Sequence, residues 1–220
     1  MRSAKAPFGA ILAGGQSRRY GSPKALAVVA GARLIDRVAR VLEQVTPDLV
    51  LLANEPDIFA DLQLPVRADV RPGLGALGGI HTGLLWAREE GRPGILAVAC
   101  DLPFPCLPLL ERVRDQAFGH ADAGRYGEPD GPDLVVPESR GRRGVEPLFA
   151  AYRVDCLPAI ENQIRQGDHR MIGFFDQVRT RRIPLARVEE LCDPGRSFLN
   201  VNTAAERRRA ERLARSDDFA

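Results

Sequence analysis

Residues 8–26 read FGAILAGGQSRRYGSPKAL, an apolar run followed by glycines and cations. It opens with an apolar run that does not alternate with polar residues, which is typical of a strand buried on both faces of a parallel sheet. Small and cationic residues follow the run, namely Gly14, Gly15, Arg18, Arg19 and Lys24. Glycines let backbone N–H groups approach an anion closely, and the cations can neutralise its charge. The stretch therefore indicates either a polyphosphate-binding loop or a basic surface loop.

Further apolar runs of strand length recur along the chain, at residues 48–53, 94–100 and 133–137. Between the runs, apolar residues recur at helical spacing around residues 34–45, 80–85 and 107–113. An alternation of buried strands with amphipathic helices predicts an α/β fold. We expect a single Rossmann-like, doubly wound domain in which helices flank a mostly parallel sheet.

The second half of the chain is less regular. Its predicted elements are a strand at 146–153 and helices at 155–166 and 170–178. Residues 119–132 are rich in glycine and proline and predict a flexible loop. Thr203 and Glu206 form the capping-box pattern that opens a helix, so residues 203–220 are expected to be a C-terminal helix and tail. Because no linker-like stretch interrupts the pattern, we assign residues 1–220 to one domain.

Composition excludes several classes of protein. The 220 residues include 31 basic and 29 acidic side chains, so the net charge of +2 favours neither a nucleic acid nor a membrane surface as partner. The apolar runs are far shorter than the roughly 20 residues of a membrane span, and the N-terminal run is too short for a signal peptide. The cysteines are widely spaced, at Cys100, Cys106, Cys156 and Cys192. They predict neither a zinc site nor a disulfide framework, but structural thiols in a reducing cytoplasm.

Polar and small residues follow the predicted strands at their carboxyl ends. These residues are Gly14, Gly15, Asn54, Asp69 and Asp101. Ligands of open parallel sheets bind at this edge. The pattern therefore predicts a polar ligand site on an apolar scaffold.

Asp101 ends a buried strand, where a carboxylate must be solvated, paired or bound to a metal. Mg²⁺ usually takes one or two carboxylates together with substrate phosphates, which suits this position. Aspartate is also a common N-cap, and the helix expected near Pro105 would give Asp101 that role instead. Spacing alone leaves both roles open.

Two other nucleotide-binding motifs, the P-loop and the dinucleotide-binding fingerprint, are alternatives to this interpretation. No G-K-[ST] follows the second glycine of the first loop, which disfavours a P-loop ATPase. Gly73, Gly75 and Gly78 have the G-x-G-x-x-G spacing of a dinucleotide-binding fingerprint, and Asp101 ends the next strand. This dehydrogenase alternative leaves the first loop unexplained.

Three motifs together resemble a known family. LAGGQSRRYGSPKAL at 12–26 resembles the signature loop of the nucleotidyltransferases that activate sugars and cofactors, and ACDLPF at 99–104 belongs to the same pattern. With FLNVNTAAE at 198–206, the chain resembles the molybdenum cofactor guanylyltransferase family, commonly called MobA, over roughly residues 8–207. Tyr20 departs from the family pattern, which has Met or Phe at that position.

The resemblance implies a role for each matching position. The implied nucleotide-binding residues are Leu12, Ala13, Gly14, Gly15, Lys24, Asn54, Asp69 and Asp101. Lys24 would contact the phosphates, Asp101 would bind Mg²⁺, and Arg19 would be the third catalytic residue. Whether Arg18 or Arg19 reaches the leaving pyrophosphate stays open. The residues implied to lie near the second substrate are Asn200, Asn202 and Arg170.

The resemblance also implies a reaction. GMP would be transferred from GTP to molybdopterin-bound molybdenum with Mg²⁺ as cofactor, which forms molybdopterin guanine dinucleotide and pyrophosphate. Molybdoenzyme apoproteins or chaperones would receive the product. The alternatives on the same scaffold are a cytidylyltransferase acting on the same cofactor and a sugar-phosphate nucleotidyltransferase. A non-catalytic protein that only carries the cofactor is a further alternative.

Overall fold

The predicted strands form one mixed sheet in a computed structural model that describes residues 5–14, 24–119 and 131–215. The strands of this sheet are β1 (Phe8–Leu12), β4 (Leu49–Leu52), β5 (Val66–Arg67), β6 (Gly94–Ala99), β7 (Leu134–Pro137), β8 (Phe149–Arg153) and β9 (Thr180–Ile183). Their order across the sheet is β5-β4-β1-β6-β8-β7-β9. β1 therefore lies inside the sheet, parallel to both β4 and β6.

The sheet is mostly parallel, as predicted. β8 pairs antiparallel with β6 and β7, whereas β5 and β9 pair parallel with their neighbours. Among the described strands of this sheet, β8 alone runs in the reverse direction. Every residue of β1, β4, β6, β7 and β8 is buried, which explains why their sequences are apolar runs without alternation.

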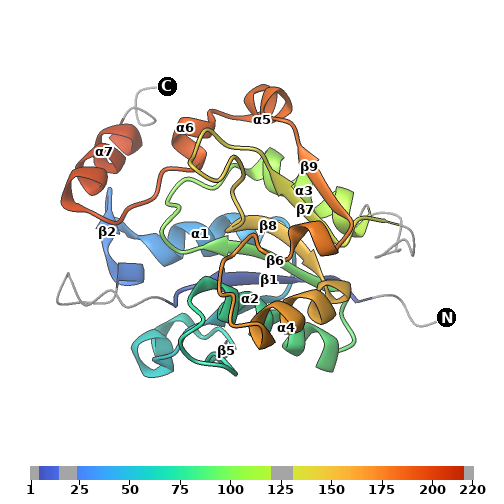
Figure 1. The fold of residues 1–220 in the computed structure, drawn as a ribbon. Coiled ribbons are helices and arrows are strands. Elements are labelled where there is room, and N and C mark those ends of the chain that lie inside the picture. The colour runs from blue at the N-terminus through green and yellow to red at the C-terminus, as the bar shows by residue number, and fades with distance from the viewer. Residues whose placement is uncertain (1–4, 15–23, 120–130, 216–220) are drawn as a thin grey trace.

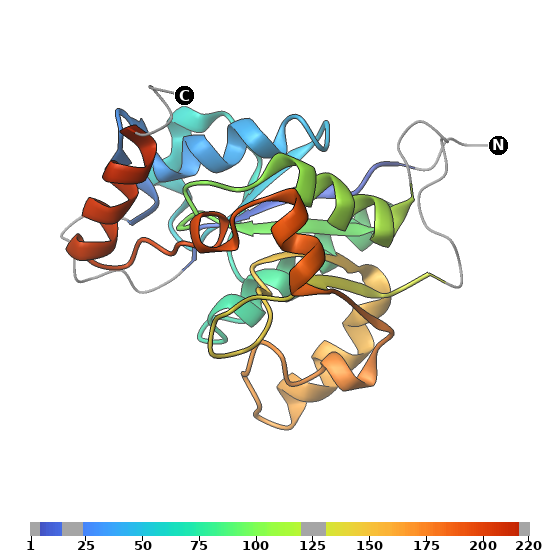
Figure 2. The ribbon, with the colours of Figure 1, turned by 90° about the horizontal axis from the view of Figure 1, so that it is seen from above.

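Helices cover both faces of the sheet. The α-helices are α1 (Leu34–Leu42), α2 (Ala76–Glu89), α3 (Leu107–Phe118), α4 (Leu157–Arg165), α5 (Leu185–Leu191), α6 (Pro194–Ser197) and α7 (Ala204–Arg215), and the 3-10 turns are η1 (Lys24–Leu26), η2 (Pro56–Leu62), η4 (Val154–Cys156) and η5 (Phe175–Gln177). Figure 2 shows the sheet between two layers, with α1 and α3 on one face and α2 and α4 on the other. This arrangement confirms the doubly wound prediction. Within the described ranges, no helix has the length and apolar character that crossing a membrane requires.

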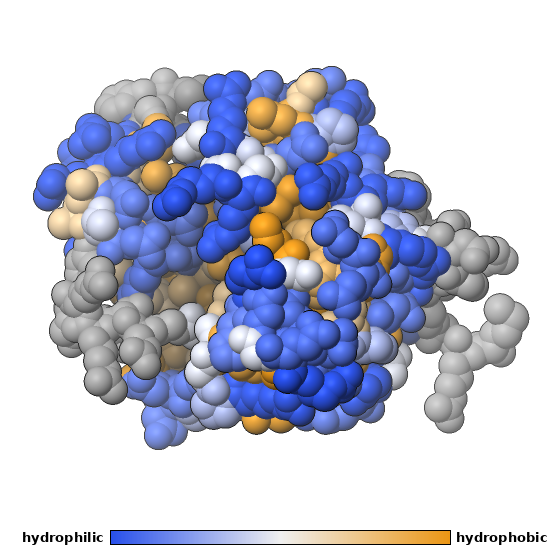
Figure 3. Space-filling model, viewed as in Figure 1, coloured by the Kyte–Doolittle hydropathy of each residue, from blue (hydrophilic) through white to orange (hydrophobic). Residues whose placement is uncertain are grey.

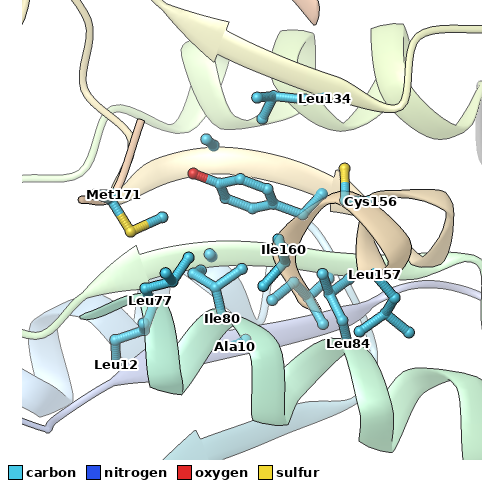
Figure 4. Packing of buried hydrophobic residues seen from close by; sticks show 14 of the residues in the cluster. Ala10, Leu12, Leu77, Ile80, Leu84, Leu134, Cys156, Leu157, Ile160 and Met171 are labelled. Carbon is cyan, nitrogen blue, oxygen red and sulfur yellow. The ribbon is translucent and has the colours of Figure 1, made fainter. Parts of the chain in front are cut away.

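Each face of the sheet has its own hydrophobic core. Under α2 and α4, Leu77, Ile80 and Leu84 meet Leu157 and Ile160 (Figure 4). Apolar residues of α1, α3 and α5 form the core on the opposite face. Burying one such side chain contributes roughly 1.5–3 kcal/mol. On the face drawn in Figure 3 the surface is mainly hydrophilic, and the hydrophobic residues that reach it lie mostly near its centre.

A third, smaller apolar cluster attaches the C-terminal helix. Its buried members are Val29, Leu34, Phe104, Leu199, Val201, Ala210 and Ala214. α7 thereby packs beside the hairpin of β2 (Val28–Val29) and β3 (Ala32–Arg33), and the two lie side by side in Figures 1 and 2. The capping box predicted for this helix is present, because Thr203 Oγ1 accepts from Glu206 N at 3.2 Å and Glu206 Oε2 accepts from Thr203 Oγ1 at 3.0 Å. The helix therefore begins where the sequence predicts.

The helix predicted at 170–178 is wrong. The chain there forms turns and the short η5 instead. Gln163 Nε2 donates to the carbonyl oxygens of Asp168, at 3.1 Å, and Arg170, at 2.6 Å. These contacts satisfy carbonyl groups through a side chain and favour the turn over a regular helical ladder. The flexible loop predicted at 119–132 lies almost wholly outside the described residues.

Candidate active site

The site is built at the carboxyl edge of the parallel strands, where the sequence places it. Ala13 N donates to Leu52 O at 3.0 Å, and Cys100 N donates to Leu12 O at 3.0 Å. The residues that end β1 are thus held between the residues that end β4 and β6. Side chains that follow these three strands must lie close to the first loop.

Lys24 and Asp101 form the centre of one half of the site. Lys24 Nζ lies 2.5 Å from Asp101 Oδ2, and the two side chains are only 14% and 18% exposed. Lys24 Nζ also donates to Asn202 Oδ1. A charge-assisted bond shielded in this way is stronger than a surface ion pair. The residue that ends the first loop is therefore joined directly to the end of β6.

The two asparagines of the N-V-N segment face Asp101 because the segment is extended. Leu199 and Val201 are buried in the third cluster, so the alternating Asn200 and Asn202 side chains point the other way. Val201 N donates to Asp101 O at 3.0 Å, which fixes the register of the segment against the end of β6. Glu206 of the capping box also accepts from Asn202 N, at 2.7 Å.

The Asn200 amide completes this half of the site. Its polar end lies 3.2 and 3.3 Å from Asp101 Oδ1 and Oδ2. A carboxylate only accepts hydrogen bonds, so the amide nitrogen faces it and donates. Asp101 thus receives hydrogen bonds from a lysine and an amide.

Asp101 does not cap the following helix, which resolves the alternative left open by spacing. The N-cap of α3 is Cys106, and that cap has no side-chain hydrogen bond. Asp101 Oδ2 and Asn202 Oδ1 instead converge on one ammonium group. Carboxylate and amide oxygens that converge on a positive charge are the donors that Mg²⁺ prefers, so the residues fit a magnesium ion. Among the described residues no cluster of three His, Cys, Asp or Glu could hold a metal, so substrate phosphates and water would have to supply other ligands.

Asn54 and Asp69 form a second pair on the other side of β1. Asn54 Nδ2 donates to Asp69 Oδ2 at 2.9 Å, and Asp69 N donates to Asn54 Oδ1 at 2.8 Å. Val70 N donates to Thr82 Oγ1 at 2.9 Å, which ties the segment after β5 to α2. The structure thus brings these two predicted residues together, at the carboxyl ends of β4 and β5.

Gly14 has no conformational reason to be glycine within the described structure. Its φ is outside the positive range, and a Cβ at this position would meet no described atom within 4 Å. A side chain is therefore compatible with the part of the protein that the structure describes, and the close approach of a ligand is one physical reason for glycine here. Gly15, Arg18, Arg19 and Tyr20 lie outside the described residues.

A cavity of about 800 Å³ adjoins Asn200 and was missed by sequence reasoning. It is lined by residues of the β7–β8 loop, α6 and α7, including Arg140, Arg142, Arg143, Glu146, Asn200 and Arg209. Arg140 pairs with Glu189 at 2.5 Å, whereas Arg142, Arg143 and Arg209 form no ion pair with a described residue. The four arginines outnumber the two carboxylates of the lining, Glu146 and Glu206, so the cavity favours an anionic ligand. The run SRGRRG at 139–144 was the local signal that could have indicated it.

Glu146 lines the same cavity as these arginines, and its pKa is raised. Burial raises the pKa of Glu146 to about 7, and the negative charge of Asp101 raises it as well. The hydrogen bond from Leu148 N and the charge of Arg143 oppose this rise. A carboxyl group that is partly protonated near neutral pH repels an anionic ligand less than an ordinary glutamate does.

The structure does not bring Arg170 into either half of the site. The Arg170 side chain is 79% exposed and pairs with Asp168 at 2.7 Å, in the turn after α4. The next residue, Met171, packs in the core beneath α2 and α4 (Figure 4). The arginines of the cavity come from other segments.

The G-x-G-x-x-G segment does not have the setting of a dinucleotide-binding fingerprint. It follows β5, the edge strand, and Asp101 follows β6. β4 and β1 separate these two strands, so Asp101 cannot stand at the end of a strand adjacent to that glycine loop. The sheet order therefore disfavours the dehydrogenase alternative.

A parallel sheet with a loop, a lysine–carboxylate pair and amides at its carboxyl edge has the parts of a nucleotidyltransferase site. The chain belongs to the family of the MobA-like NTP transferase domain, whose family model matches residues 9–181. The family membership, the fold class and the enzyme class predicted from the sequence are thereby confirmed.

Similar proteins carry names that agree with the predicted function. A probable molybdenum cofactor guanylyltransferase of Pelotomaculum thermopropionicum is 34% identical over 94% of this chain and 92% of its own length. A molybdenum cofactor guanylyltransferase of Desulfosudis oleivorans is 35% identical over 92% and 93%. Among solved structures, molybdopterin-guanine dinucleotide biosynthesis protein A of Archaeoglobus fulgidus superposes with a TM-score of 0.72 at 24% identity, covering 95% of this chain and 99% of that one.

Proposed function

We propose that this enzyme transfers GMP from GTP to molybdopterin-bound molybdenum, forming molybdopterin guanine dinucleotide and releasing pyrophosphate. The observation that carries the proposal is the Lys24–Asp101–Asn202 cluster, which lies at the carboxyl edge of the sheet. The names of the relatives support the choice of substrates and do not favour the cytidylyltransferase or sugar-phosphate alternatives.

The nucleotide would bind across the end of β1. The nucleotide would lie against the backbone of Leu12, Ala13 and Gly14. Asn54 and Asp69 offer hydrogen-bonding groups beside this segment. Lys24 would donate to the phosphates of GTP, and Arg19 and Gly15 are proposed to join it from the first loop. Orientation of the α-phosphate by several fixed donors lowers the entropic cost of the transfer.

Asp101, with the amide oxygen of Asn202 nearby, would hold the divalent cation, which we propose is Mg²⁺, and the Asn200 amide nitrogen would orient the Asp101 carboxylate. When bound, Mg²⁺ neutralises the charge that builds on the phosphate oxygens and the leaving pyrophosphate. Lys24 contributes a further positive charge at the same place. The half-buried position of Lys24 and Asp101 makes each charge more effective than it would be in open water.

The acceptor would occupy the arginine-lined cavity. Arg142, Arg143 and Arg209 supply positive charge for a phosphate-bearing ligand, and the volume of about 800 Å³ lies in the range of small-molecule sites. Asn200 lines this cavity and also contacts Asp101, so it lies where the two substrates would meet. The attacking group is a phosphate that is already anionic, so the reaction requires no protein base.

The setting proposed for this reaction is the cytoplasm, because all four cysteines are free thiols. Molybdoenzyme apoproteins or chaperones are proposed to receive the product.

The deciding experiment is pyrophosphate release with each of the four nucleoside triphosphates, with and without the molybdenum cofactor. We expect release that requires Mg²⁺, GTP and the acceptor together, with a guanine dinucleotide identified by mass spectrometry. Release with CTP in place of GTP would assign the cytidylyltransferase function instead. Tight binding of the cofactor without any release would indicate a carrier protein.

A further inference from the structure

Cys106 and Cys192 lie together although they are far apart in the sequence. Cys106 is the N-cap of α3, and Cys192 is the C-cap of α5. Cys106 Sγ lies 3.6 Å from the carbonyl oxygen of Leu191, the residue that precedes Cys192. Both cysteines also line one small cavity, so they are neighbours in the fold.

Both thiols are accessible from one small cavity. They line a pocket of about 360 Å³ together with Arg37, Arg40 and Arg196. Each of the two cysteines is only partly buried. A thiol-reactive molecule can therefore reach the pair, and the three arginines outnumber the one acidic residue of the lining, Asp193, which favours an anionic molecule.

The two sulfur atoms differ in reactivity. Interaction with the Cys106 side chain lowers the pKa of Cys192 to about 7, against the opposing effect of burial, and interaction with the Ser197 side chain lowers it further. The same contact raises the pKa of Cys106. Cys192 is thus the thiolate that attacks first, and Cys106 is the neighbouring thiol that can resolve the product.

The other two cysteines serve as internal comparisons. Cys100 and Cys156 are buried in the strand and helix layers. Burial raises the pKa of Cys100 to about 12 and raises the pKa of Cys156 as well. Both are inert by access and by acidity, so any reaction should be confined to the pair.

We propose that Cys106 and Cys192 are a redox-sensitive pair that forms a reversible intramolecular disulfide by exchange with an anionic low-molecular-weight disulfide, such as oxidised glutathione. The Cys192 thiolate attacks one sulfur of the small disulfide and expels the other half as a thiolate, which leaves a mixed disulfide on Cys192. Cys106 then loses its proton, attacks the Cys192 sulfur and expels the second small thiolate. The protein is oxidised by two electrons and loses two hydrogens, and the small disulfide is reduced to two thiols.

The bond would join the two chain segments that carry one half of the active site. Asp101 lies shortly before Cys106, and Asn200 and Asn202 follow Cys192 through α6. These segments already touch, since Val201 N donates to Asp101 O. The disulfide would therefore clamp α3 to the α5–α6 junction beside the metal-binding positions. Cytoplasmic disulfides of this kind are usually transient and redox-sensing.

The test is to treat the full-length reduced protein with oxidised glutathione and map its cysteines by mass spectrometry under non-reducing conditions. We expect an intact mass lower by two hydrogens, one cross-linked peptide pair containing Cys106 and Cys192, and complete reversal by dithiothreitol. Cys106→Ser should stop at a stable mixed disulfide on Cys192. Cys192→Ser should react far more slowly, and Cys100→Ala should behave like the wild type.

The proposal is overturned by a wild-type protein that ends as a mixed disulfide, by a cross-link that involves Cys100 or Cys156, or by no reaction at all. Thermal unfolding of each reduced variant checks that it is folded before treatment. Because the readout is mass and not turnover, the result does not depend on the proposed transferase activity.

Discussion

At the scale of single residues, the site rests on a small number of contacts with distinct physical roles. Lys24 and Asp101 supply opposite charges in a half-buried setting, and Asn202 contacts Lys24. Gly14 leaves space beside the described residues instead of making a side-chain contact. Lys24 and Asp101 act through charge, whereas Gly14 acts through the absence of a side chain. Substitutions at these positions can therefore separate effects on ligand binding from effects on folding.

Gly14→Ala tests whether glycine is required by the ligand. Because a Cβ at Gly14 meets no described atom within 4 Å, the variant should unfold at the wild-type temperature. GTP binding should weaken by roughly tenfold or more, because an added methyl group would hold the nucleotide away from the backbone. A tenfold loss of affinity corresponds to about 1.4 kcal/mol. Calorimetric titration with GTP and thermal unfolding measure the two effects.

The comparison variant is Gly94→Ala. A Cβ at Gly94 would lie 2.1 Å from the carbonyl oxygen of Tyr152, which belongs to the paired strand and cannot turn away. This variant should be destabilised while Gly14→Ala is not. Unchanged GTP affinity in Gly14→Ala would remove Gly14 from the nucleotide site.

Asp101→Asn tests the metal assignment. The amide keeps the size of the side chain but removes its charge, so GMP transfer should fall by roughly 100-fold and half-saturation should need more Mg²⁺. Activity measured across a Mg²⁺ titration shows both changes. Asp57→Asn, an exposed aspartate of η2, is the matched control and should behave like the wild type. Full turnover of Asp101→Asn at low Mg²⁺ would refute the assignment.

At the scale of elements, strand pairing depends on side chains at the strand ends as well as on the ladder. Asp133, which precedes β7 and is 7% exposed, accepts from Arg179 N at 2.9 Å and from the Arg179 guanidinium at 2.6 Å. Arg179 precedes β9, so this one carboxylate holds the edge of the sheet. Burial by itself raises the pKa of Asp133, but the hydrogen bonds and charge of Arg179 lower it below the ordinary value overall.

Asp133→Asn should lower the free energy of unfolding by about 2–3 kcal/mol at neutral pH, because a buried charge-assisted contact is lost. A carboxylate whose folded pKa is depressed stabilises the fold above its unfolded pKa, and this stabilisation is lost as the pH falls through the folded pKa. The difference between wild type and variant should therefore shrink in acid. Urea unfolding at a series of pH values measures it.

Glu190→Gln is the control for an exposed ion pair. Glu190 pairs with Arg187 within α5, and both side chains are more than half exposed, so this substitution should change stability little. Equal effects of the two substitutions would show that burial does not strengthen the Asp133 contact.

The elements also show how far sequence reasoning reaches. β1, β4 and β6 could be predicted because strands buried on both faces must be apolar throughout. The turn at 170–178 could not, because the side chain of Gln163, from the preceding helix, decides it. Asn54, Asp69 and Asp101 could be placed at one edge because strand direction alone fixes which ends meet.

At the scale of the whole molecule, the unpredicted features are those assembled from distant segments. The arginine-lined cavity takes its walls from the β7–β8 loop, α6 and α7, and the thiol pair joins α3 to α5. Contacts between segments that are distant in the sequence leave no local sequence pattern from which they could be predicted. Arg170, which the family resemblance implied near the second substrate, pairs with Asp168 and does not line this cavity, so its role stays a prediction.

At this scale, the proposed function places the nucleotide and the acceptor on separate surfaces, and substitutions can test that separation. Replacing Arg142 and Arg143 together by alanine should raise the KM for the acceptor by roughly tenfold while the KM for GTP stays unchanged, because two charges are lost from the cavity alone. Steady-state kinetics with each substrate varied in turn measure this.

The control pair is Arg181→Ala with Arg182→Ala. Both arginines are exposed residues of β9 and lie outside the cavity. Their replacement removes the same net charge as the first double variant does. A similar loss in both double variants would assign the effect to overall charge. A rise in the KM for GTP in the first variant would place the nucleotide, not the acceptor, beside the arginines.

The position of Asn202 also separates the site from the scaffold that carries it. β9, the last described strand in chain order, ends at Ile183, so the N-V-N segment adds no strand to the sheet. Asn202 nevertheless contacts Lys24, which lies 178 positions earlier in the sequence. Detachment of this segment would therefore take apart one half of the site while the sheet stays paired.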